Sequence, residues 1–293
     1  MNRLWNYISF INTALTRMGK SLKLDRVEWI VSLKRAVDRY IEERPCQTYM
    51  GGHRLYMPKY IYGGYVNRFE NDEAYTIELF SRLVRPGHIV LDVGANIGYY
   101  SLLAARLVGE IGIVYAIEPD PRNCRFLMKN IYANGYKNIK VLPIAISDKS
   151  GTKPLFLDRD STETSLIRQK RREQAIIGEI VIETMSIDEL CERERIQHVE
   201  VIKIDIEGGE PAAIRGAIET IRTNDITLFV EFCPLALKDS QTNPEEFIEL
   251  LRDVGLKVFL IDEKQRRLLP EPLAYVQGDK VLGELKGNLL CHK

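Results

Sequence analysis

The sequence predicts an α/β fold with a doubly wound, mostly parallel sheet. From residue 72 onward, short apolar runs typical of buried strands alternate with helical patterns of about ten to fifteen residues. Such alternation indicates a parallel sheet whose two faces are covered by helices. The chain has 293 residues and is 45% hydrophobic, which suffices for one full core with a smaller attachment.

The predicted core elements follow one another in a regular order. A helix over 73–83 ends at Arg85-Pro86-Gly87, and 88–93 is then expected as a buried strand. Further strands are expected at 113–117, 139–145, 199–204, 226–232, 257–261 and near 288–291, and helices at 99–108, 122–134, 211–222 and 244–254. Asn243 before a proline and a capping box from Ser186 to Glu189 mark two helix starts.

Residues 1–70 are predicted to form a helical and hairpin extension in front of a main domain over 71–293. Residues 1–45 carry a helical repeat, whereas 49–65 combine glycine pairs with tyrosines, which favours a hairpin and loop over a helix. Residues 1–20 are too short and too interrupted for a membrane span or a signal peptide. We expect them to pack on the body, with contact to a membrane surface as the alternative.

The composition limits the cellular compartment and the kinds of binding partner that we expect for this chain. Lys and Arg number 41, as do Asp and Glu, so no global field favours nucleic acid or an anionic membrane. The basic run over 168–172 is expected to be a solvated face. The five cysteines are scattered singly, which indicates neither a disulfide framework nor a zinc site and fits the cytoplasm. The sequence does not indicate an oligomeric state.

An insertion is predicted between the third and fourth strands of the core. Residues 155–157 and 180–182 are expected to pair as strands, joined by a polar stretch over 158–178. That stretch suits a mobile loop over a site, or equally a plain surface excursion.

The strongest local signal is the loop from Asp92 to Gly98, between a strand and a helix. Gly94 and Gly98 allow a sharp turn and let a ligand approach without interference from a Cβ. A dinucleotide-binding loop would carry a third glycine where Asn96 stands, and an acid beside the loop disfavours a pyrophosphate. Asp92 instead suits a ligand with cationic groups. The loop therefore favours S-adenosylmethionine over NAD.

Two further strand ends extend this predicted cofactor site. Glu118, followed by Pro119, lies about 20 residues beyond the loop, the spacing at which an acid reaches ribose hydroxyls. The third strand leads into Ala145 and Ile146, which could flank an adenine. Asp148 could form hydrogen bonds with the edge of that adenine.

The fourth and fifth strands end in charged residues. Lys203, Asp205 and Glu207 end the fourth strand, and Glu231 ends the fifth. Such groups are costly at a buried strand end unless they meet a ligand, a metal or one another. They could form a general base with its orienting partners, a structural salt-bridge cluster around Lys203, or an oxygen-rich magnesium site, which we favour least.

The motifs together resemble the FkbM family. The segments 92–98, 118–119, 145–148, 186–188 and 203–210 carry the resemblance, which covers about 73–233 well. It implies a class I, Rossmann-like methyltransferase with a seven-stranded sheet whose last strand is antiparallel, and O-methylation of sugar or polyketide hydroxyls. Asp92, Gly94, Asn96 and Glu118 match cofactor positions, and Asp205 and Glu207 the acidic segment. Gly209 stands where many members carry histidine.

The resemblance sharpens the hypothesis about function. We expect methyl transfer from S-adenosylmethionine to a hydroxyl of a small molecule or glycan, with Asp205 as base or cofactor contact and Glu207, Lys203 and Glu231 positioning the acceptor. No metal is assigned. The alternatives are an NAD-dependent oxidoreductase and a catalytically inactive cofactor-binding scaffold. His53, His88, His198 and His292 are expected to be structural or surface residues.

Overall fold

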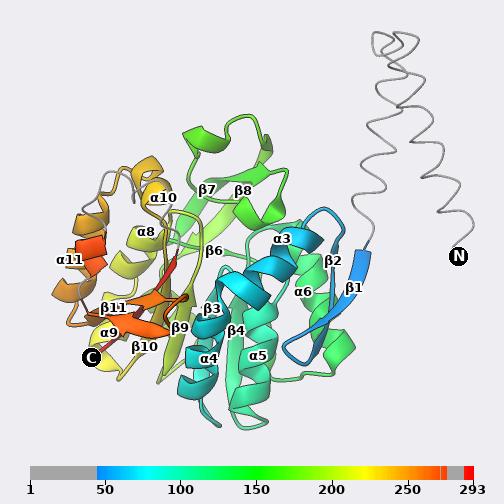
Figure 1. Ribbon diagram of the computed structural model, residues 1–293, viewed down its shortest axis with the longest axis horizontal. Coiled ribbons are helices and arrows are strands. Elements are labelled where there is room, and N and C mark those ends of the chain that lie inside the picture. The colour runs from blue at the N-terminus through cyan, green and yellow to red at the C-terminus, as the bar shows by residue number, and fades with distance from the viewer. Residues whose placement is uncertain (1–44, 271, 276–286) are drawn as a thin grey trace, which may run out of the picture.

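The computed structural model describes residues 45–270, 272–275 and 287–293. Its centre is an eight-stranded sheet in the order β12-β11-β13-β10-β9-β3-β4-β5 (Figure 1). The strands are β3 (Ile89–Val93), β4 (Ile113–Ile117), β5 (Ile139–Leu142), β9 (Val201–Ile204), β10 (Thr227–Phe232), β11 (Lys257–Asp262), β12 (Arg267–Leu269) and β13 (Gly287–His292). Strands β5, β4, β3, β9 and β10 pair in parallel, whereas β13 is antiparallel to both β10 and β11. The predicted doubly wound sheet is therefore confirmed.

The sheet has one strand more than the seven that the resemblance implies. The additional strand is β12, three residues at the edge that fold back antiparallel on β11, with Leu269 opposite Leu260. A strand of three residues is too short to show a period of two in the sequence.

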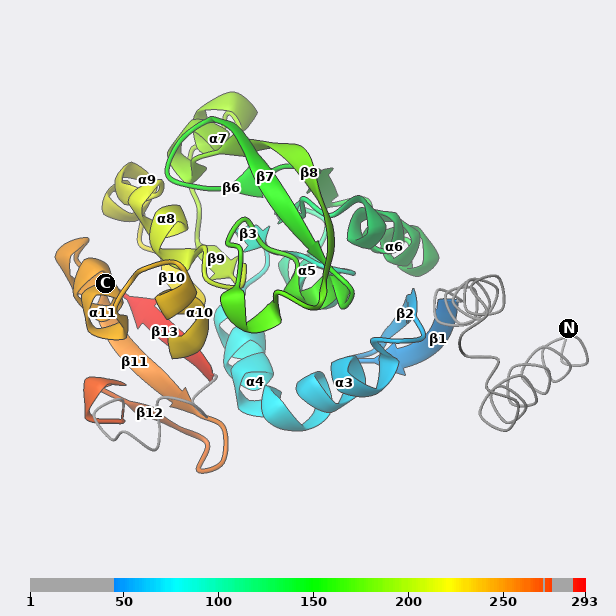
Figure 2. The same cartoon turned by 90° about the horizontal axis from the view of Figure 1, so that it is seen from above.

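Helices cover both faces of the sheet, as Figure 2 shows from above. They are α4 (Ala74–Leu83), α5 (Tyr99–Val108), α6 (Pro121–Asn134), α7 (Ile187–Glu194), α8 (Glu210–Arg215), α9 (Ile218–Thr223), α10 (Pro234–Asp239) and α11 (Pro244–Asp253), with a 3₁₀ turn η5 at Pro272–Tyr275. Alternate residues of β3 enter different cores: Leu91 and Val93 join one apolar cluster, and Val90 joins the other. Such double burial explains why these strands are almost wholly apolar. No helix in the described part of the chain is long and apolar enough to cross a bilayer.

Two predicted elements are divided in the structure. The helix expected over 211–222 is two short helices, because glycine is a weak helix former and the backbone leaves helical geometry at Gly216 and at Ala217, whose φ is −123°. A Cβ on Gly216 would lie 2.4 Å from the Ser147 carbonyl oxygen. The strand expected over 139–145 ends at Leu142, since Pro143 cannot donate to a strand ladder. The chain then leaves the central sheet as β6 (Ala145–Ile146).

The insertion forms a second sheet above the carboxyl edge of the central one (Figure 1). Strands β7 (Gly151–Asp158) and β8 (Ile176–Met185) pair antiparallel, with Leu155 opposite Ile180, and β6 pairs parallel with β8. The predicted strand pair is confirmed. The connection between them, residues 159–175, carries two short 3₁₀ turns, η3 (Ser161–Glu163) and η4 (Lys170–Arg172).

The glycine- and tyrosine-rich segment forms a hairpin, β1 (Pro45–Met50) and β2 (His53–Pro58), as predicted. The predicted loop after it is wrong, because 62–67 form helix α3 and 68–72 form a π-helical segment, η2. Ile61, Tyr65 and Phe69, four residues apart, are all buried and hold this helical path on the body. The helix expected over 1–45 lies almost wholly outside the described residues.

We expect Gly94→Ala to destabilise the fold strongly. Gly94 has φ +83°, and a Cβ there would lie 1.9 Å from the Asp205 carbonyl oxygen. Gly135 is the matched control, since its φ is +73° but no atom lies within 4 Å of an added Cβ. Urea unfolding should show a loss of about 1 kcal/mol for Gly135→Ala and of roughly 3 kcal/mol or more for Gly94→Ala. Equal losses would contradict the importance of this contact.

Candidate active site

Three hollows meet at the carboxyl edge of the sheet. The first, which we call the loop cavity, has a volume of about 40 Å³ and lies between the glycine loop and the insertion. Of the residues predicted from the sequence, its lining includes Gly94, Asn96, Glu118, Pro119, Ala145, Ile146, Asp205 and Glu207. Residues at the ends of β3, β4 and β9 therefore converge as the parallel topology requires, because the carboxyl ends of parallel strands share one edge. Ala145 and Ile146 join them from β6 of the smaller sheet.

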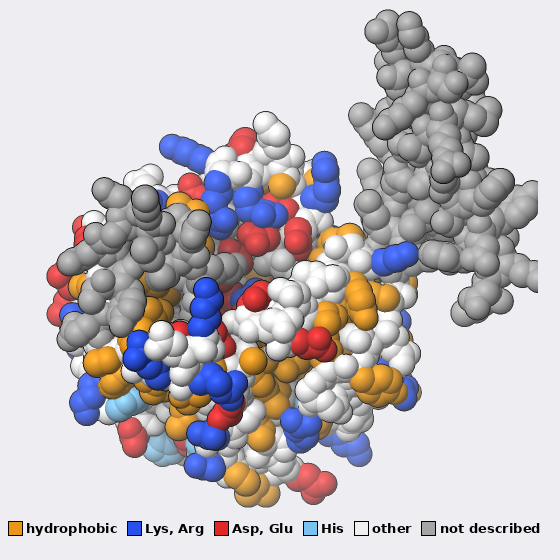
Figure 3. Space-filling view, in the orientation of Figure 1, with side chains coloured by type: hydrophobic (Ala, Val, Ile, Leu, Met, Phe, Trp, Pro, Cys, Tyr) orange, Lys and Arg blue, Asp and Glu red, His pale blue; other side chains and the backbone are white. Residues whose placement is uncertain are grey.

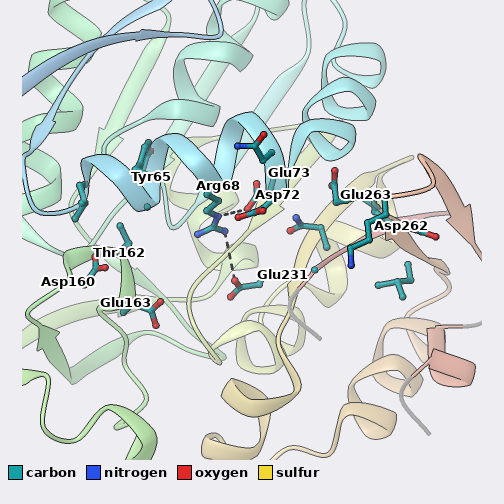
Figure 4. A pocket seen from close by; sticks show the side chains of 18 of the residues that line it. Tyr65, Arg68, Asp72, Glu73, Asp160, Thr162, Glu163, Glu231, Asp262 and Glu263 are labelled. Carbon is teal, nitrogen blue, oxygen red and sulfur yellow. Dashed lines mark hydrogen bonds and ion pairs between the residues drawn. The ribbon is translucent and has the colours of Figure 1, made fainter. Parts of the chain in front are cut away.

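The other two hollows lie on the far side of Asp205. The inner cavity, about 30 Å³, is lined by Asp92, Lys203 and Arg68 among others. The outer cleft, about 720 Å³, opens between η2, the insertion and the β11–β12 turn (Figure 4). Thr162 lines all three hollows, and Arg68 lines the inner cavity and the outer cleft. The three hollows therefore lie next to one another.

Glu118 is buried at the wall of the loop cavity. Its two carboxylate oxygens accept hydrogen bonds from the backbone N–H of Asn96 at 2.7 Å and of Asp120 at 2.8 Å. Burial raises the pKa of the Glu118 carboxyl to about 8. Asn96 reaches this position in the left-handed region, with φ +53°. The carboxyl is thus fixed by main-chain donors and directed at the cavity.

Asn123, on α6, was not found from the sequence. Its side-chain amide donates to the Ser161 carbonyl oxygen at 2.9 Å, and the side chain is 2% exposed. Its Oδ1 atom has no hydrogen-bond partner among the described residues. A buried acceptor without a donor is costly, so this atom suits a ligand that brings a hydroxyl or amino group.

The two glycines of the loop serve contacts within the protein. A Cβ on Gly98 would lie 2.6 Å from Leu127 Cδ1, and Gly94 meets the Asp205 carbonyl oxygen. Gly98 thus serves internal packing, whereas Gly94 combines such packing with a place in the lining of the loop cavity, where a ligand can approach it. Gly98 lines none of the three hollows.

Asp92 and Asp148 lie away from the loop cavity. Asp92 is buried and accepts a hydrogen bond from Ser101 Oγ at 2.5 Å. Burial raises the pKa of its carboxyl, against the opposing effect of Lys203. Asp148 is exposed and pairs with Lys153 at 3.1 Å, and it does not line the cavity.

The predicted acidic residues come together around Arg68. Oxygens of Asp205, Glu207 and Glu231 lie within 4.8 Å of one another. Arg68 Nη2 lies 2.6 Å from Asp205 Oδ2 and 3.9 Å from Glu231 Oε1, and Lys203 Nζ lies 3.1 Å from Asp205 Oδ2. Figure 4 shows Arg68 reaching between Glu73 and Glu231.

Basic side chains lie beside each of these carboxylates. Arg171, from the insertion, lies 3.7 Å from Glu207 and 3.6 Å from Asp239. Burial lowers the pKa of Lys203, but Asp205 and Asp92 outweigh it, so that pKa is raised and the side chain stays charged. Because three cations already neutralise the cluster, we assign no magnesium ion to it. The basic run expected to be solvated thus contributes Arg171, and Arg172 beside Glu163, to the site. Figure 3 shows basic and acidic side chains next to one another over the insertion, at the top of the view.

The loop after β9 is held in an unusual conformation. Glu207 has φ +54°, and Glu210 accepts hydrogen bonds from the backbone N–H of Ile206 and Gly208, each at 2.9 Å. Burial, and then the nearby Glu231, raise the pKa of Glu210 to about 8. Ser165 and Gln169 of the insertion donate to the Glu207 carbonyl oxygen at 2.9 and 3.0 Å.

Arg68, Glu73, Tyr100 and Thr162 belong to the site but were not found from the sequence. Arg68 donates to Glu73, whose other oxygen accepts from Tyr100 at 2.7 Å. No motif marks them, since only the fold brings 68–73 beside β9. His53 bonds to Tyr136, away from the site, and burial lowers its pKa to about 4.

Comparisons with known proteins point to one kind of enzyme. A family profile described as the methyltransferase FkbM domain matches residues 92–258. The 2-O-methyltransferase NoeI of Sinorhizobium fredii is 26% identical over 186 residues, 59% of this chain and 75% of that protein. A protein-L-isoaspartate O-methyltransferase of Methanosarcina mazei is 41% identical over 56 residues, 19% of this chain and 23% of that protein. The crystal structure of methyltransferase FkbM from Methylobacillus flagellatus KT has 16% identity and a TM-score of 0.44, over 74% of this chain and half of that one.

We expect the free energy of unfolding to fall as the pH rises from about 6.5 to about 8, by on the order of 1 kcal/mol per pH unit for each raised carboxyl. Below about 6.5 the lowered pKa of His53 has the opposite effect and offsets part of the fall. Glu118 and Glu210 bind a proton more tightly when folded, so their contribution is complete below the unfolded pKa and is lost as the pH rises through about 8. Urea unfolding at several pH values across this range measures the fall in the free energy of unfolding.

Glu118→Gln should reduce this fall, because glutamine does not titrate. Glu249→Gln, at an exposed position on α11, is the matched control and should leave the fall unchanged. Stability that increases with pH, or an unaltered fall in Glu118→Gln, would contradict the assignment.

Proposed function

Because the chain belongs to the FkbM methyltransferase family, we propose that it transfers the methyl group of S-adenosylmethionine to a hydroxyl oxygen of a small-molecule or glycan acceptor. The observation that carries this proposal is that a narrow cavity and a large cleft share Thr162 and adjoin the same inner cavity, through Asp205 on the side of the narrow cavity and Arg68 on the side of the cleft. Two reactants must meet in line for such a transfer. The relative named as a 2-O-methyltransferase supports oxygen as the acceptor atom.

The chemistry of the loop cavity suits the nucleoside part of the methyl donor. Glu118 is placed to accept hydrogen bonds from ribose hydroxyls, and Asn123 Oδ1 is a buried acceptor beside it. Ala145 and Ile146 give an apolar wall for an adenine. The cavity is small, so admitting the nucleoside requires residues 161–166 of the insertion to move outward. When bound, the donor supplies a methyl group activated by a sulfonium.

The acidic residues of the junction suit the acceptor side. As the new carbon–oxygen bond forms and the carbon–sulfur bond breaks, the acceptor hydroxyl must lose its proton. We assign that proton to Asp205, with Glu207, Lys203 and Glu231 positioning the acceptor. A general base in hydrogen-bond reach contributes typically about 10²–10⁴-fold. Arg68 and Lys203 both bond to Oδ2 of Asp205 and so fix the direction of its carboxylate.

Calorimetric titration with S-adenosylhomocysteine, with NAD as the control ligand, tests the cofactor. We expect micromolar binding of the first and none of the second. Glu118→Gln should weaken that binding by about tenfold or more, because one of the two carboxyl oxygens becomes an NH2 group that cannot accept a hydrogen bond, whereas Glu249→Gln should not. Binding of NAD alone would refute the proposal, and binding of S-adenosylhomocysteine without methyl transfer to any acceptor would favour an inactive scaffold.

Asp205→Asn should lower the rate of methyl transfer by about 10²-fold or more while S-adenosylhomocysteine affinity stays within about threefold. The measurement is transfer of a labelled methyl group to a panel of sugar and polyol hydroxyls. Unchanged turnover together with unchanged cofactor affinity would show that Asp205 is neither the general base nor a cofactor contact.

A further inference from the structure

The outer cleft has the dimensions of a site for a small molecule. Its volume of about 720 Å³ lies within the range of pockets that enclose a drug-sized ligand. The cleft lies beside the loop cavity, with Thr162 in the lining of both. Tyr60, whose hydroxyl bonds to Ser161 Oγ, and Tyr65 supply aromatic surface to its wall. An acceptor bound in the cleft would therefore reach the junction of the hollows.

The lining of this cleft is strongly acidic although the whole chain has a formal net charge of zero. Seven carboxylates line it, from Asp72, Glu73, Asp160, Glu163, Glu231, Asp262 and Glu263, against two basic side chains, Arg68 and Lys264. They come from η2, the insertion, β10 and the β11–β12 turn. A concave surface with one sign of charge concentrates its field inside the hollow.

Several of these carboxylates have neutral hydrogen-bond donors as partners. Asp72 accepts from the Asn67 amide at 2.9 Å, and Asp160 from the backbone and hydroxyl of Thr162. Glu263 accepts from the backbone N–H of Tyr75 and Thr76 at the start of α4. Neutral donors orient a carboxylate without cancelling its charge, so these residues keep the cleft negative.

Other carboxylates of the cleft have basic neighbours at its edge. Glu163 lies 3.4 Å from Arg172 and 3.9 Å from Arg171, and Asp262 lies 3.5 Å from Arg267. Figure 4 shows Asp160 and Glu163 on one side of the cleft, Asp262 and Glu263 on the other, and Arg68 with Glu231 between them. The negative charge that flanks the centre therefore comes mainly from Asp160 on one side and Glu263 on the other, which accept hydrogen bonds from neutral donors.

We infer that the acceptor is a hydroxylated molecule that carries a positively charged amine, such as an amino sugar. This inference rests on the proposed function and specifies its acceptor class. The reacting hydroxyl would lie near Arg68 and Asp205, and the amine would lie toward either flank. A neutral polyol would gain hydrogen bonds in this cleft but no charge attraction, and an anionic acceptor would be repelled.

The test compares two disaccharides that share a sugar backbone. The probes are chitobiose with both amines free and N,N′-diacetylchitobiose, titrated calorimetrically into the full chain saturated with S-adenosylhomocysteine, below the pKa of the amines. We expect the free-amine form to bind about tenfold more tightly or better. Added salt should weaken the binding of the free-amine form and leave the binding of the acetylated form unchanged. Equal affinity, tighter binding of the acetylated form, or no binding of the free-amine form would overturn the inference.

Paired variants locate the effect in the cleft. Asp72→Asn combined with Asp262→Asn should weaken free-amine binding by about tenfold and leave S-adenosylhomocysteine affinity unchanged. The control is Asp253→Asn combined with Glu249→Gln, two exposed positions on α11 outside the cleft lining. An equal loss in both double variants would refute the cleft as the source. If wild-type protein does not bind S-adenosylhomocysteine, the proposed function fails. The two disaccharides are then compared on the protein without S-adenosylhomocysteine, which decides separately whether the cleft prefers a cationic ligand.

Discussion

The ionic contact between Arg68 and Asp205 is the interaction on which the site depends. It joins η2, from the N-terminal side of the chain, to the end of β9 over 137 positions of sequence. The same guanidinium contacts Glu73 and lies near Glu231, so one side chain bridges three carboxylates, and Lys203 adds a second positive charge at Asp205. Charges in such a partly buried place are stable only as a set, because removal of one partner leaves the others uncompensated. The position of η2, and with it one wall of the cleft, is therefore tied to the strand end that carries Asp205.

Two loops beside this contact each hold a non-glycine residue in the left-handed region. These residues are Asn96, in the glycine loop, and Glu207, two positions after Asp205. Gly94 packs on the Asp205 carbonyl oxygen, and the insertion bonds to the Glu207 carbonyl oxygen. Such conformations persist only where the surroundings enforce them. The acidic loop is thus shaped from the sheet on one side and from the insertion on the other.

The sequence was sufficient for the main features of the fold and insufficient for the shorter ones. Strands such as 113–117 and helices such as 99–108 are long enough for their periodicity to show, and the structure has them at these bounds. Strand β12 and helix α10, at three and six residues, are shorter than the patterns that would reveal them. Helix α3 was concealed because Gly63 and Gly64 suggested a turn, while the burial of Tyr65 that holds it is a property of the assembled fold.

The residues of the candidate site were likewise predictable from the sequence only in part. Residues that follow strands, such as Glu118 and Asp205, could be predicted to converge, because the carboxyl ends of parallel strands share an edge. Arg68 and Thr162 could not, since neither follows a strand of the central sheet and only long-range packing brings them there. Asn123 lies on a helix face, where an asparagine gives no local sign that its amide is buried.

The outer cleft has walls that lie outside the doubly wound core. Its acidic side chains come mainly from η2, from the connection between β7 and β8, and from the β11–β12 turn. Surface connections of this kind accept substitutions and insertions that buried strands do not. Related chains could therefore diverge in what they modify while the donor-facing strand ends stay unchanged. For the same reason, the specificity of this scaffold can be redesigned at a few surface segments without repacking its centre.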